Sequence, residues 1–459
     1  MDFRYIEQNF DVKGVKINGI CIWPIIKSYL IGIESDTQVI KEASPSIINT
    51  LLKNLISDIF SYRKIKKSRN WVFTNSERRY SVNQESFDRV SSGLLNYVKD
   101  YILFENPLPK GKTMKKDLLE GEHYVGMSWV FLLQFLALKF SKKPAIDNFS
   151  TLESFLDKDL KKIREIVHRI YAGASVYDFL IRRYRPQAIF VVCYYSNFEV
   201  IRAAKRNKVP IIELQHGLVS KGHRAYYFLK YYGKEFLPDY FMSYGPYSSD
   251  IVIKGNLMKP EKVLNYGYSF LEEVNNKLTI SEELNSIKKK FKKVICITGQ
   301  LPMTDIPLLK IIDEVSDYFP EYCFIFNPRF LKDSTTFTEK PNFICLGHLN
   351  TYELLSYSDY HITVYSTCAM ESLALGTPNI SVDIKGYYSQ FLKSMLHGNQ
   401  YNYEVDSAQE LKKILQLLED KDFNKGKVKD SIGLIFSKMV PSKTFLDFFQ
   451  KIIKQKTNH

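Results

Sequence analysis

Short runs of apolar residues alternate with longer stretches of helical periodicity along most of the chain. The runs are rich in β-branched and aromatic residues and are bounded by Pro, Gly or charge, as expected of strands. In the first half they predict strands at 71–74, 101–104, 188–193, 210–214 and 240–244. In the second half they predict strands at 293–298, 323–326, 343–346, 360–364 and 379–382. Continuous apolar strands alternating with helices indicate parallel sheets covered on both faces, so the pattern predicts two α/β units in series.

A polar and increasingly basic stretch at 275–293 separates the two predicted units. It contains a serine followed by two glutamates, which is typical of a helix start, and ends in lysines, which suit a helix C-terminus. We therefore predict an N-terminal domain at 1–275 and a C-terminal domain at 276–440. Residues 441–459 are predicted to form a final helix whose apolar stripe needs a groove in which it can be buried.

The composition is that of a globular protein, since 45% of the 459 residues are hydrophobic and 25% are charged. Lys and Arg total 64 against 50 for Asp and Glu, which gives a formal net charge of +14. This excess favours an anionic partner, which could be nucleic acid, a phosphate-rich substrate or an acidic membrane surface. The basic residues form no zinc-finger, RRM or helix-turn-helix signature, so we expect no nucleic acid partner.

The cysteines and the N-terminal residues indicate in which cell compartment the protein is found. The six cysteines are dispersed, form no C-x-x-C pair and lie partly within apolar runs, as reduced core residues do. The first residues lack the apolar region of a secretory signal. We therefore expect a cytoplasmic protein.

One apolar segment, at 127–140, bears on a membrane location. It is too short to span a bilayer, which needs about 20 residues, and is therefore either a core helix or an interfacial helix. Lysines that would suit anionic headgroups flank it on both sides. They are Lys110, Lys112, Lys115, Lys116, Lys142 and Lys143. This pattern leaves open a peripheral position on the inner face of the plasma membrane.

The segment 361–378 combines a buried strand, a Ser-Thr pair, a helix and a Gly-Thr-Pro turn. Ser366 and Thr367 would stand at the helix N-terminus, where free N–H groups and the helix dipole favour a phosphate. Glu371 follows Thr367 by one helical turn, so its carboxylate could accept hydrogen bonds from ribose hydroxyls. An ordinary helix cap with a solvated glutamate is the alternative interpretation.

The predicted strand at 210–214 delivers Gln215, His216 and Gly217 to its carboxyl end, the edge at which open α/β sheets bind ligands. An imidazole titrates near neutrality, so His216 could take the proton of an acceptor hydroxyl. His223 lies on the following loop and could orient an acceptor or a phosphate. Structural roles for both histidines are the alternative.

Weaker signals lie at three other strand ends. Gly299 and Gln300 follow the first strand of the second unit, where a glycine would let a donor approach the backbone closely. Arg329 follows the next strand and could supply charge to a diphosphate. Arg78 and Arg79 follow the strand at 71–74 and could clamp an acceptor phosphate, although ion pairs with neighbouring acids would use them equally well.

The segment 361–378 resembles the donor-binding motif of GT-B glycosyltransferases, in which a Ser/Thr-rich turn meets the diphosphate and a glutamate holds the ribose. The Gln-His-Gly sequence resembles the acceptor domain of bacterial capsule, teichoic-acid-polymerase and surface-carbohydrate transferases. Many relatives carry a Lys-x-His-Pro-like sequence where this chain has Asn-Pro-Arg at 327–329, so a role for that histidine does not carry over. The resemblance covers about residues 185–385.

The resemblance implies an α/β protein of the GT-B class, with two Rossmann-like domains facing across a cleft and a C-terminal helix that crosses back. It further implies transfer of a sugar from a nucleotide-sugar donor to a glycan or a polyprenyl-diphosphate-linked acceptor. Capsule, O-antigen and other lipopolysaccharide synthesis are the implied settings. We expect no metal and no other cofactor, because helix dipole and side chains can hold such donors and no D-x-D sequence lies at a strand end.

Three alternatives remain. A CDP-glycerol-type polyol-phosphate transferase would keep the fold and move a different group, and a sugar-nucleotide 2-epimerase would need no second substrate. A non-catalytic basic scaffold that binds membrane or nucleic acid belongs to a different class. A scaffold of this kind would not explain why polar groups converge at strand ends in both units.

Overall fold

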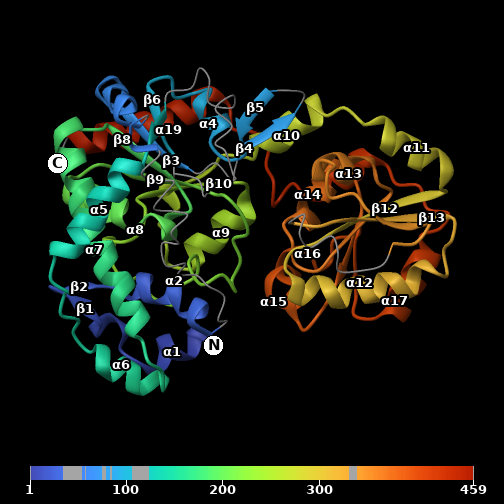
Figure 1. Ribbon diagram of the computed structural model, residues 1–459, viewed down its shortest axis with the longest axis horizontal. Helices are drawn as coiled ribbons and strands as arrows, with labels where there is room; N and C mark the ends of the chain where they lie inside the picture. The colour runs from blue at the N-terminus through green and yellow to red at the C-terminus, as the bar shows by residue number, and fades with distance from the viewer. Residues whose placement is uncertain are drawn as a thin grey trace.

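The computed structural model describes residues 2–34, 54–56, 58–74, 79–82, 85–105, 124–329 and 339–457. Figure 1 shows two α/β bodies side by side, with α10 (Ser269–Lys277) between them at the top of the view and α11 (Glu282–Lys290) further along, at the upper right of the second body. Each body is built on its own parallel sheet. The two units predicted from the apolar runs are therefore confirmed.

The first sheet contains seven strands, all paired in parallel. Its order is β11-β10-β9-β8-β3-β6-β7, so the chain starts in the middle and moves outward in both directions. The strands are β3 (Asn70–Thr74), β6 (Tyr101–Glu105), β7 (Tyr124–Gly126), β8 (Ala188–Val192), β9 (Ile211–Leu214), β10 (Tyr240–Ser243) and β11 (Val263–Asn265). Small hairpins are formed by β1 (Lys16–Ile17) with β2 (Ile20–Cys21) and by β4 (Arg79–Val82) with β5 (Glu85–Asp88).

The second sheet contains six parallel strands in the order β14-β13-β12-β15-β16-β17. This arrangement again starts in the middle, which is the order of a Rossmann-like sheet. The strands are β12 (Lys293–Thr298), β13 (Tyr322–Asn327), β14 (Phe343–Cys345), β15 (Tyr360–Thr363), β16 (Asn379–Val382) and β17 (Asn402–Val405). Both sheets thus place a reversal of strand order at their centre, between β3 and β8 and between β12 and β15.

Helices cover both faces of each sheet because alternate strand residues point to opposite faces. In the first domain, Trp71 and Phe73 join one core with residues of α2, α7 and α8, whereas Val72 joins the other. The helices are α1 (Phe3–Asn9), α2 (Trp23–Glu34), α4 (Ser92–Leu95), α5 (Ser128–Phe140), α6 (Phe149–Leu156), α7 (Lys161–Tyr184), α8 (Phe198–Arg206) and α9 (Pro246–Lys254).

In the second domain the two faces of β12 enter separate cores. Ile295 packs with apolar residues of α12 and α17, and Cys296 packs with residues of α10, α11 and α13. The helices after α11 are α12 (Pro302–Ser316), α13 (Thr351–Tyr357), α14 (Cys368–Leu375), α15 (Tyr387–Phe391), α16 (Lys393–Leu396), α17 (Ala408–Leu417) and α18 (Lys425–Asp430). Because α10 packs with the second sheet, the predicted division at residue 275 falls inside a helix of that core.

The last helix, α19 (Ser442–Thr457), returns to the first domain and covers the face of its sheet that carries Val72. The Phe449 ring lies 5.7 Å from that of Phe190 in β8, and the Phe448 ring lies 5.8 Å from that of Tyr240 in β10. The apolar stripe predicted for this helix therefore has its groove on the first sheet, and the predicted crossing back is confirmed.

Candidate functional site

His216 stands just past the carboxyl end of β9, beside the end of β8. Its Nε2 atom lies 3.3 Å from the Tyr195 hydroxyl, and its Nδ1 atom lies 3.5 Å from the Tyr226 hydroxyl. The ring is half-buried. The structure thus surrounds the predicted base with hydroxyl groups that can fix its orientation and exchange protons with it.

Glu213, three residues before His216, is fully buried within β9. Its Oε1 atom accepts hydrogen bonds from the Tyr226 hydroxyl (2.7 Å) and the Tyr194 backbone N–H (3.2 Å), while Oε2 has no partner. Burial raises the pKa of this carboxyl to about 8. Tyr226 therefore lies between a carboxyl that holds its proton at neutral pH and the His216 ring.

Gln215 and Gly217, on either side of His216, have different roles in the fold. Gln215 Nε2 donates to the Gly217 carbonyl (2.9 Å) and the Ser248 hydroxyl (3.0 Å), and its Oε1 accepts from the Tyr244 N–H (2.7 Å). Gln215 thus ties the end of β9 to β10 and α9. A Cβ atom at Gly217 would meet nothing within 4 Å, so the turn does not require glycine for space.

His223 lies on the loop after β9, close to the same tyrosines. Its ring centroid is 4.8 Å from that of Tyr226 and 5.6 Å from that of Tyr195. Its Nδ1 accepts the Ala225 N–H (3.2 Å), which leaves the proton of the neutral ring on Nε2. Burial and the charge of Arg224 lower the pKa of His223 to about 3, so this ring is neutral at physiological pH.

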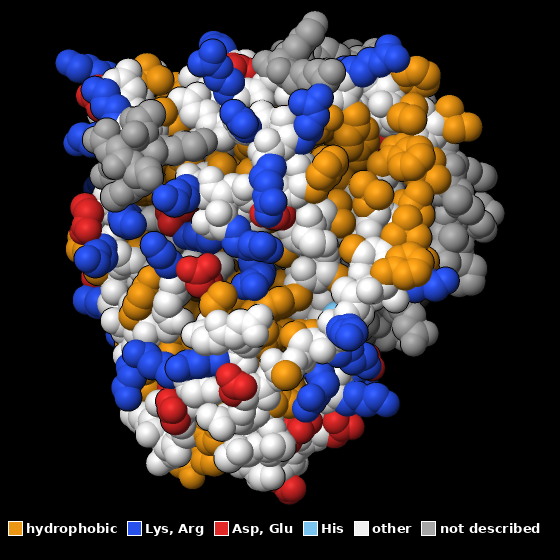
Figure 2. Space-filling model, turned by 90° about the vertical axis from the view of Figure 1, so that its left-hand side faces the viewer, with side chains coloured by type: hydrophobic (Ala, Val, Ile, Leu, Met, Phe, Trp, Pro, Cys, Tyr) orange, Lys and Arg blue, Asp and Glu red, His pale blue; other side chains and the backbone are white. Residues whose placement is uncertain are grey.

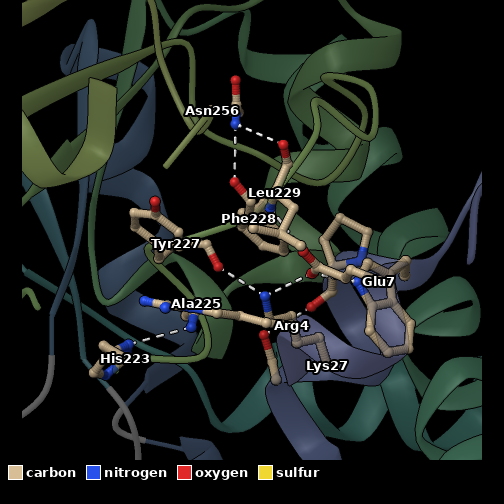
Figure 3. A network of polar contacts seen from close by, with 12 residues as sticks. Arg4, Glu7, Lys27, His223, Ala225, Tyr227, Phe228, Leu229 and Asn256 are labelled. Carbon is tan, nitrogen blue, oxygen red and sulfur yellow. Dashed lines mark hydrogen bonds and ion pairs between the residues drawn. The ribbon is translucent and has the colours of Figure 1, made fainter. Parts of the chain in front are cut away.

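The loop that carries His223 is anchored by a buried ion pair from the N-terminal helices (Figure 3). Lys27 Nζ lies 2.6 Å from Glu7 Oε1 and donates to the Tyr227 carbonyl at 2.7 Å. The Leu229 N–H donates to Glu7 Oε2 at 2.7 Å. These charge-assisted bonds fix the backbone just after His223. The first helices of the chain therefore position one side of the candidate site.

In the second domain, Ser366 and Thr367 stand where the sequence places them, between β15 and α14. Thr367 is the N-cap residue of α14, and the Ser366 hydroxyl accepts the Cys368 N–H at 3.3 Å. Ser366 is buried and Thr367 is half-buried. The start of α14 lies next to the reversal of strand order, the usual place for a ligand in such sheets.

Glu371, in the first turn of α14, is buried and accepts hydrogen bonds from Tyr352, Arg89 and Cys368. The Tyr352 hydroxyl lies 3.3 Å from Oε2, and Nη2 of Arg89, from the first domain, lies 3.3 Å from Oε1. Burial raises the pKa of Glu371, and the Arg89 charge lowers it in part. The carboxylate predicted to hold a ribose is thus paired, in this structure, with an arginine from the facing domain.

Gly299 and Gln300 form the turn from β12 into α12. A Cβ atom at Gly299 would lie 2.7 Å from Asp305 Oδ2 and 3.1 Å from the Phe326 ring, so the backbone here has no room for a side chain. The Gln300 N–H donates to Asp305 Oδ1 at 2.8 Å. Arg329 follows β13 and is exposed. The glycine at 299 is therefore explained by close packing within the domain.

The predicted phosphate clamp after β3 stays a prediction. Arg78 lies outside the described residues, and the structure describes the backbone of Arg79, the first residue of β4, without its side chain. Among the described residues, no group of three or more His, Cys, Asp or Glu is arranged to hold a metal ion.

The two domains meet at the loop after β9 and at helix α9. Leu218 packs against a core cluster that contains Ala369 and Met370 of α14. The Tyr247 hydroxyl of α9 lies 2.9 Å from the Ser394 hydroxyl of α16. The loop that follows His216 therefore packs against the same apolar cluster as the helix that carries Glu371.

No family model matches the sequence, and neither does any curated protein. The structure is similar to the UDP-N-acetylglucosamine 2-epimerase from Rickettsia bellii, with a TM-score of 0.53, 11% identity, and coverage of 84% of this chain and 98% of that chain. The UDP-GlcNAc 2-epimerase from Neisseria meningitidis bound to UDP-GlcNAc matches with a TM-score of 0.51, 14% identity, and coverage of 83% and 99%. The calicheamicin glycosyltransferase CalG4 matches with a TM-score of 0.50, 10% identity, and coverage of 84% and 98%.

The chain has a GT-B fold. At these identities the likeness concerns the arrangement of the chain, and the reaction has to be argued from the site.

Three residues that the sequence did not single out belong to this site. Tyr195 contacts His216, and Arg89 and Tyr352 contact Glu371. Tyr195 follows a predicted strand, which is a usable signal, since ligand-binding residues gather at such ends. Arg89 and Glu371 are 282 positions apart, and no local pattern connects them.

Proposed function

We propose that this chain is an enzyme that binds a nucleotide-sugar at the start of α14 and transfers a proton through the groups around His216. The observation that carries the proposal is the pairing of two kinds of chemistry in one GT-B fold. A helix N-terminus at a reversal of strand order suits a diphosphate, and a histidine with hydroxyl and carboxyl neighbours stands at the carboxyl end of a strand in the other sheet.

The first candidate reaction is glycosyl transfer to a hydroxyl of a glycan or a polyprenyl-diphosphate-linked acceptor in bacterial surface glycan synthesis. The acceptor oxygen bonds to the anomeric carbon while the bond from that carbon to the diphosphate breaks. His216 takes the acceptor proton, and the N–H groups at the start of α14 stabilise the charge of the departing nucleoside diphosphate. The Gln-His-Gly and Ser-Thr-x-x-x-Glu sequences favour this reading.

A second candidate is epimerisation of the nucleotide-sugar at carbon 2, which the names of most structural neighbours given above favour. Such a reaction needs groups that remove a carbon-bound proton and return one from the opposite face. Glu213 and His216, joined through Tyr226, offer an acid and a base within one cluster. Of the two readings, the comparisons support this one more directly.

One experiment separates the readings. The purified chain is screened for thermal stabilisation by UDP, GDP, CMP, CDP and dTDP conjugates, because a ligand at 100 times its dissociation constant adds about 2.7 kcal/mol. The conjugate that binds is then incubated alone in D₂O. Deuterium at carbon 2 with a new epimer identifies the epimerase, whereas an unchanged or slowly hydrolysed sugar is expected of a transferase. Stabilisation by CDP-glycerol alone would indicate a polyol-phosphate transferase, and no stabilisation by any conjugate would overturn the proposal.

A further inference from the structure

Helix α5 exposes large apolar side chains along most of its length. Leu133 and Leu136 are each 40% exposed, Phe135 is 63% exposed and Phe140 is 80% exposed. Of the thirteen residues of the helix, Ser128 and Val130 alone are buried. A surface helix of a globular protein normally turns its apolar stripe to the core, so this arrangement calls for a partner.

A second exposed apolar group lies on residues 54–56 and 58–60, which are bound to the start of α5. Ile56, Ile59 and Phe60 are 77%, 49% and 60% exposed. The Trp129 indole N–H donates to the Leu55 carbonyl at 2.8 Å, and the Ser128 N–H donates to Asp58 Oδ2 at 3.1 Å. We call this group, together with Leu133, Phe135, Leu136 and Phe140, the α5 patch. Figure 2 looks onto this side of the molecule and shows hydrophobic side chains gathered in one area beside Lys and Arg side chains.

The charged residues within and just after these two segments are mostly basic. Exposed cations lie beside both apolar groups, namely Arg63, Lys64, Lys139, Lys142 and Lys143. The Arg63 guanidinium lies 5.7 Å from the centre of the Phe60 ring, so charge and apolar surface adjoin directly. Helix α5 contains no acidic residue, and Asp58 accepts the Ser128 N–H. The patch is therefore apolar with a cationic border.

We propose that the α5 patch docks on a lipid bilayer that contains anionic headgroups. Phe135 and Phe140 would enter the interface while the lysines at 139, 142 and 143 meet the headgroups. A second copy of the chain is the less favoured occupant, because two such patches would bring like-charged borders together, and the net charge of +14 adds to that repulsion. Within the described residues, no helix has the length and hydrophobicity to cross a membrane. The proposal does not depend on the reaction proposed above.

The test is sedimentation of the full chain with phosphatidylcholine vesicles prepared with or without phosphatidylglycerol. We expect at least about tenfold tighter binding to the anionic vesicles and release at high salt. The double variant Phe135→Ser/Phe140→Ser should weaken binding by about tenfold or more. Lys139→Ser/Lys142→Ser/Lys143→Ser should bring binding to anionic vesicles down to the level of neutral ones.

Leu417→Ser is the matched control, since Leu417 is 59% exposed on α17 of the second domain and should leave vesicle binding unchanged. All these positions are on the surface, so melting temperatures should stay at that of the parent. Equal binding to both vesicle types, or no binding at all, would overturn the proposal. So would a dimer in light scattering that Phe135→Ser/Phe140→Ser dissociates, because the patch would then join two copies.

Discussion

Glu213 carries a carboxyl group that the fold keeps in its neutral form. One of its oxygens accepts two hydrogen bonds and the other has no partner, in a position without solvent contact. An ionised carboxylate there would lack the donors that normally offset burial. The residue is therefore a source of pH dependence that can be measured without knowing the substrate.

We expect the free energy of unfolding to fall by about 2 kcal/mol between pH 6.5 and pH 8. In that window the unfolded chain has already released the Glu213 proton, while the folded chain holds it up to a pKa of about 8, so rising pH favours unfolding. The lowered pKa values of His223 and His361 act below pH 6.5, where falling pH destabilises the fold. Denaturant titrations at several pH values check this, and Glu213→Gln should remove the decline. A parent protein with constant stability from pH 6.5 to pH 8 would show that Glu213 ionises normally.

His216→Ala should lower kcat by about 10²–10⁴ with little change in nucleotide affinity, because the proposed proton-transfer group is lost while the proposed nucleotide site lies in the other domain. Steady-state kinetics and calorimetry with the nucleotide found in the screen provide the measurements. His348→Ala is the control, since His348 is exposed and pairs with Glu283 in the second domain. If folded His216→Ala keeps more than about a tenth of the parent rate, the base is another residue.

The contact between Arg89 and Glu371 should contribute to the stability of the two-domain arrangement. Arg89→Met leaves a buried carboxylate with Tyr352 and Cys368 as its partners, and we expect a loss of roughly 1–3 kcal/mol, since the Arg89 side chain is 33% exposed. Glu371→Gln should cost less. In a double-mutant cycle the two changes should couple by at least about 0.5 kcal/mol, measured by denaturant unfolding. Additive effects would mean that the Arg89–Glu371 contact does not contribute to the free energy of unfolding.

The central strands of both sheets and the edge strand β14 could be predicted from the sequence, whereas three other edge strands could not. The strands at 293–298 and 379–382 match their predicted bounds, and the others differ by one residue at one end or, for β13, at both ends. The missed strands are β7, β11 and β17, each at the edge of its sheet. An edge strand is covered less completely, so its sequence lacks the continuous apolar run that marks a buried strand.

The candidate site could be predicted only as far as local patterns extend. The strand ends that carry His216 and the Ser366-Thr367 turn follow from the apolar runs. The burial of Glu371 does not, because it depends on Arg89 and on α13, which come from distant parts of the sequence. Gln215 likewise looks available for a ligand in the sequence, and its partners on β10 and α9 become visible only in the fold.

Helix α19 offers a test of packing at the scale of a single element. Phe445 is fully buried against the first sheet, and its neighbour Leu446 is 41% exposed. Phe445→Ala should therefore lower the free energy of unfolding by about 3–5 kcal/mol, through lost burial and the cavity left behind. Leu446→Ala should change it by less than about 0.5 kcal/mol. Equal effects of the two substitutions in thermal unfolding would show that the helix is not packed on the sheet in solution.

At the scale of the whole molecule, the two domains are interleaved rather than arranged one after the other along the chain. Helix α10 begins before the predicted division at 275 yet packs with the second sheet, and α19 follows the second sheet yet packs with the first. Besides these helices, the N–H groups of Ser437 and Val440 donate to the carbonyls of Tyr244 and Tyr266 (2.8 and 3.0 Å), which fixes the returning segment. The domain bounds 1–275, 276–440 and 441–459 stay a prediction.

The return of α19 has a consequence for how the protein is made. A ribosome adds roughly 5–20 residues per second, so the segment that covers one face of the first sheet emerges roughly ten seconds or more after that sheet. Until then, Phe190 and Tyr240 lack their aromatic partners on α19. The nascent first domain must pass this interval with an uncovered apolar face, while the second domain is still being synthesised. Docking of α19 is then the step that completes a domain begun hundreds of residues earlier.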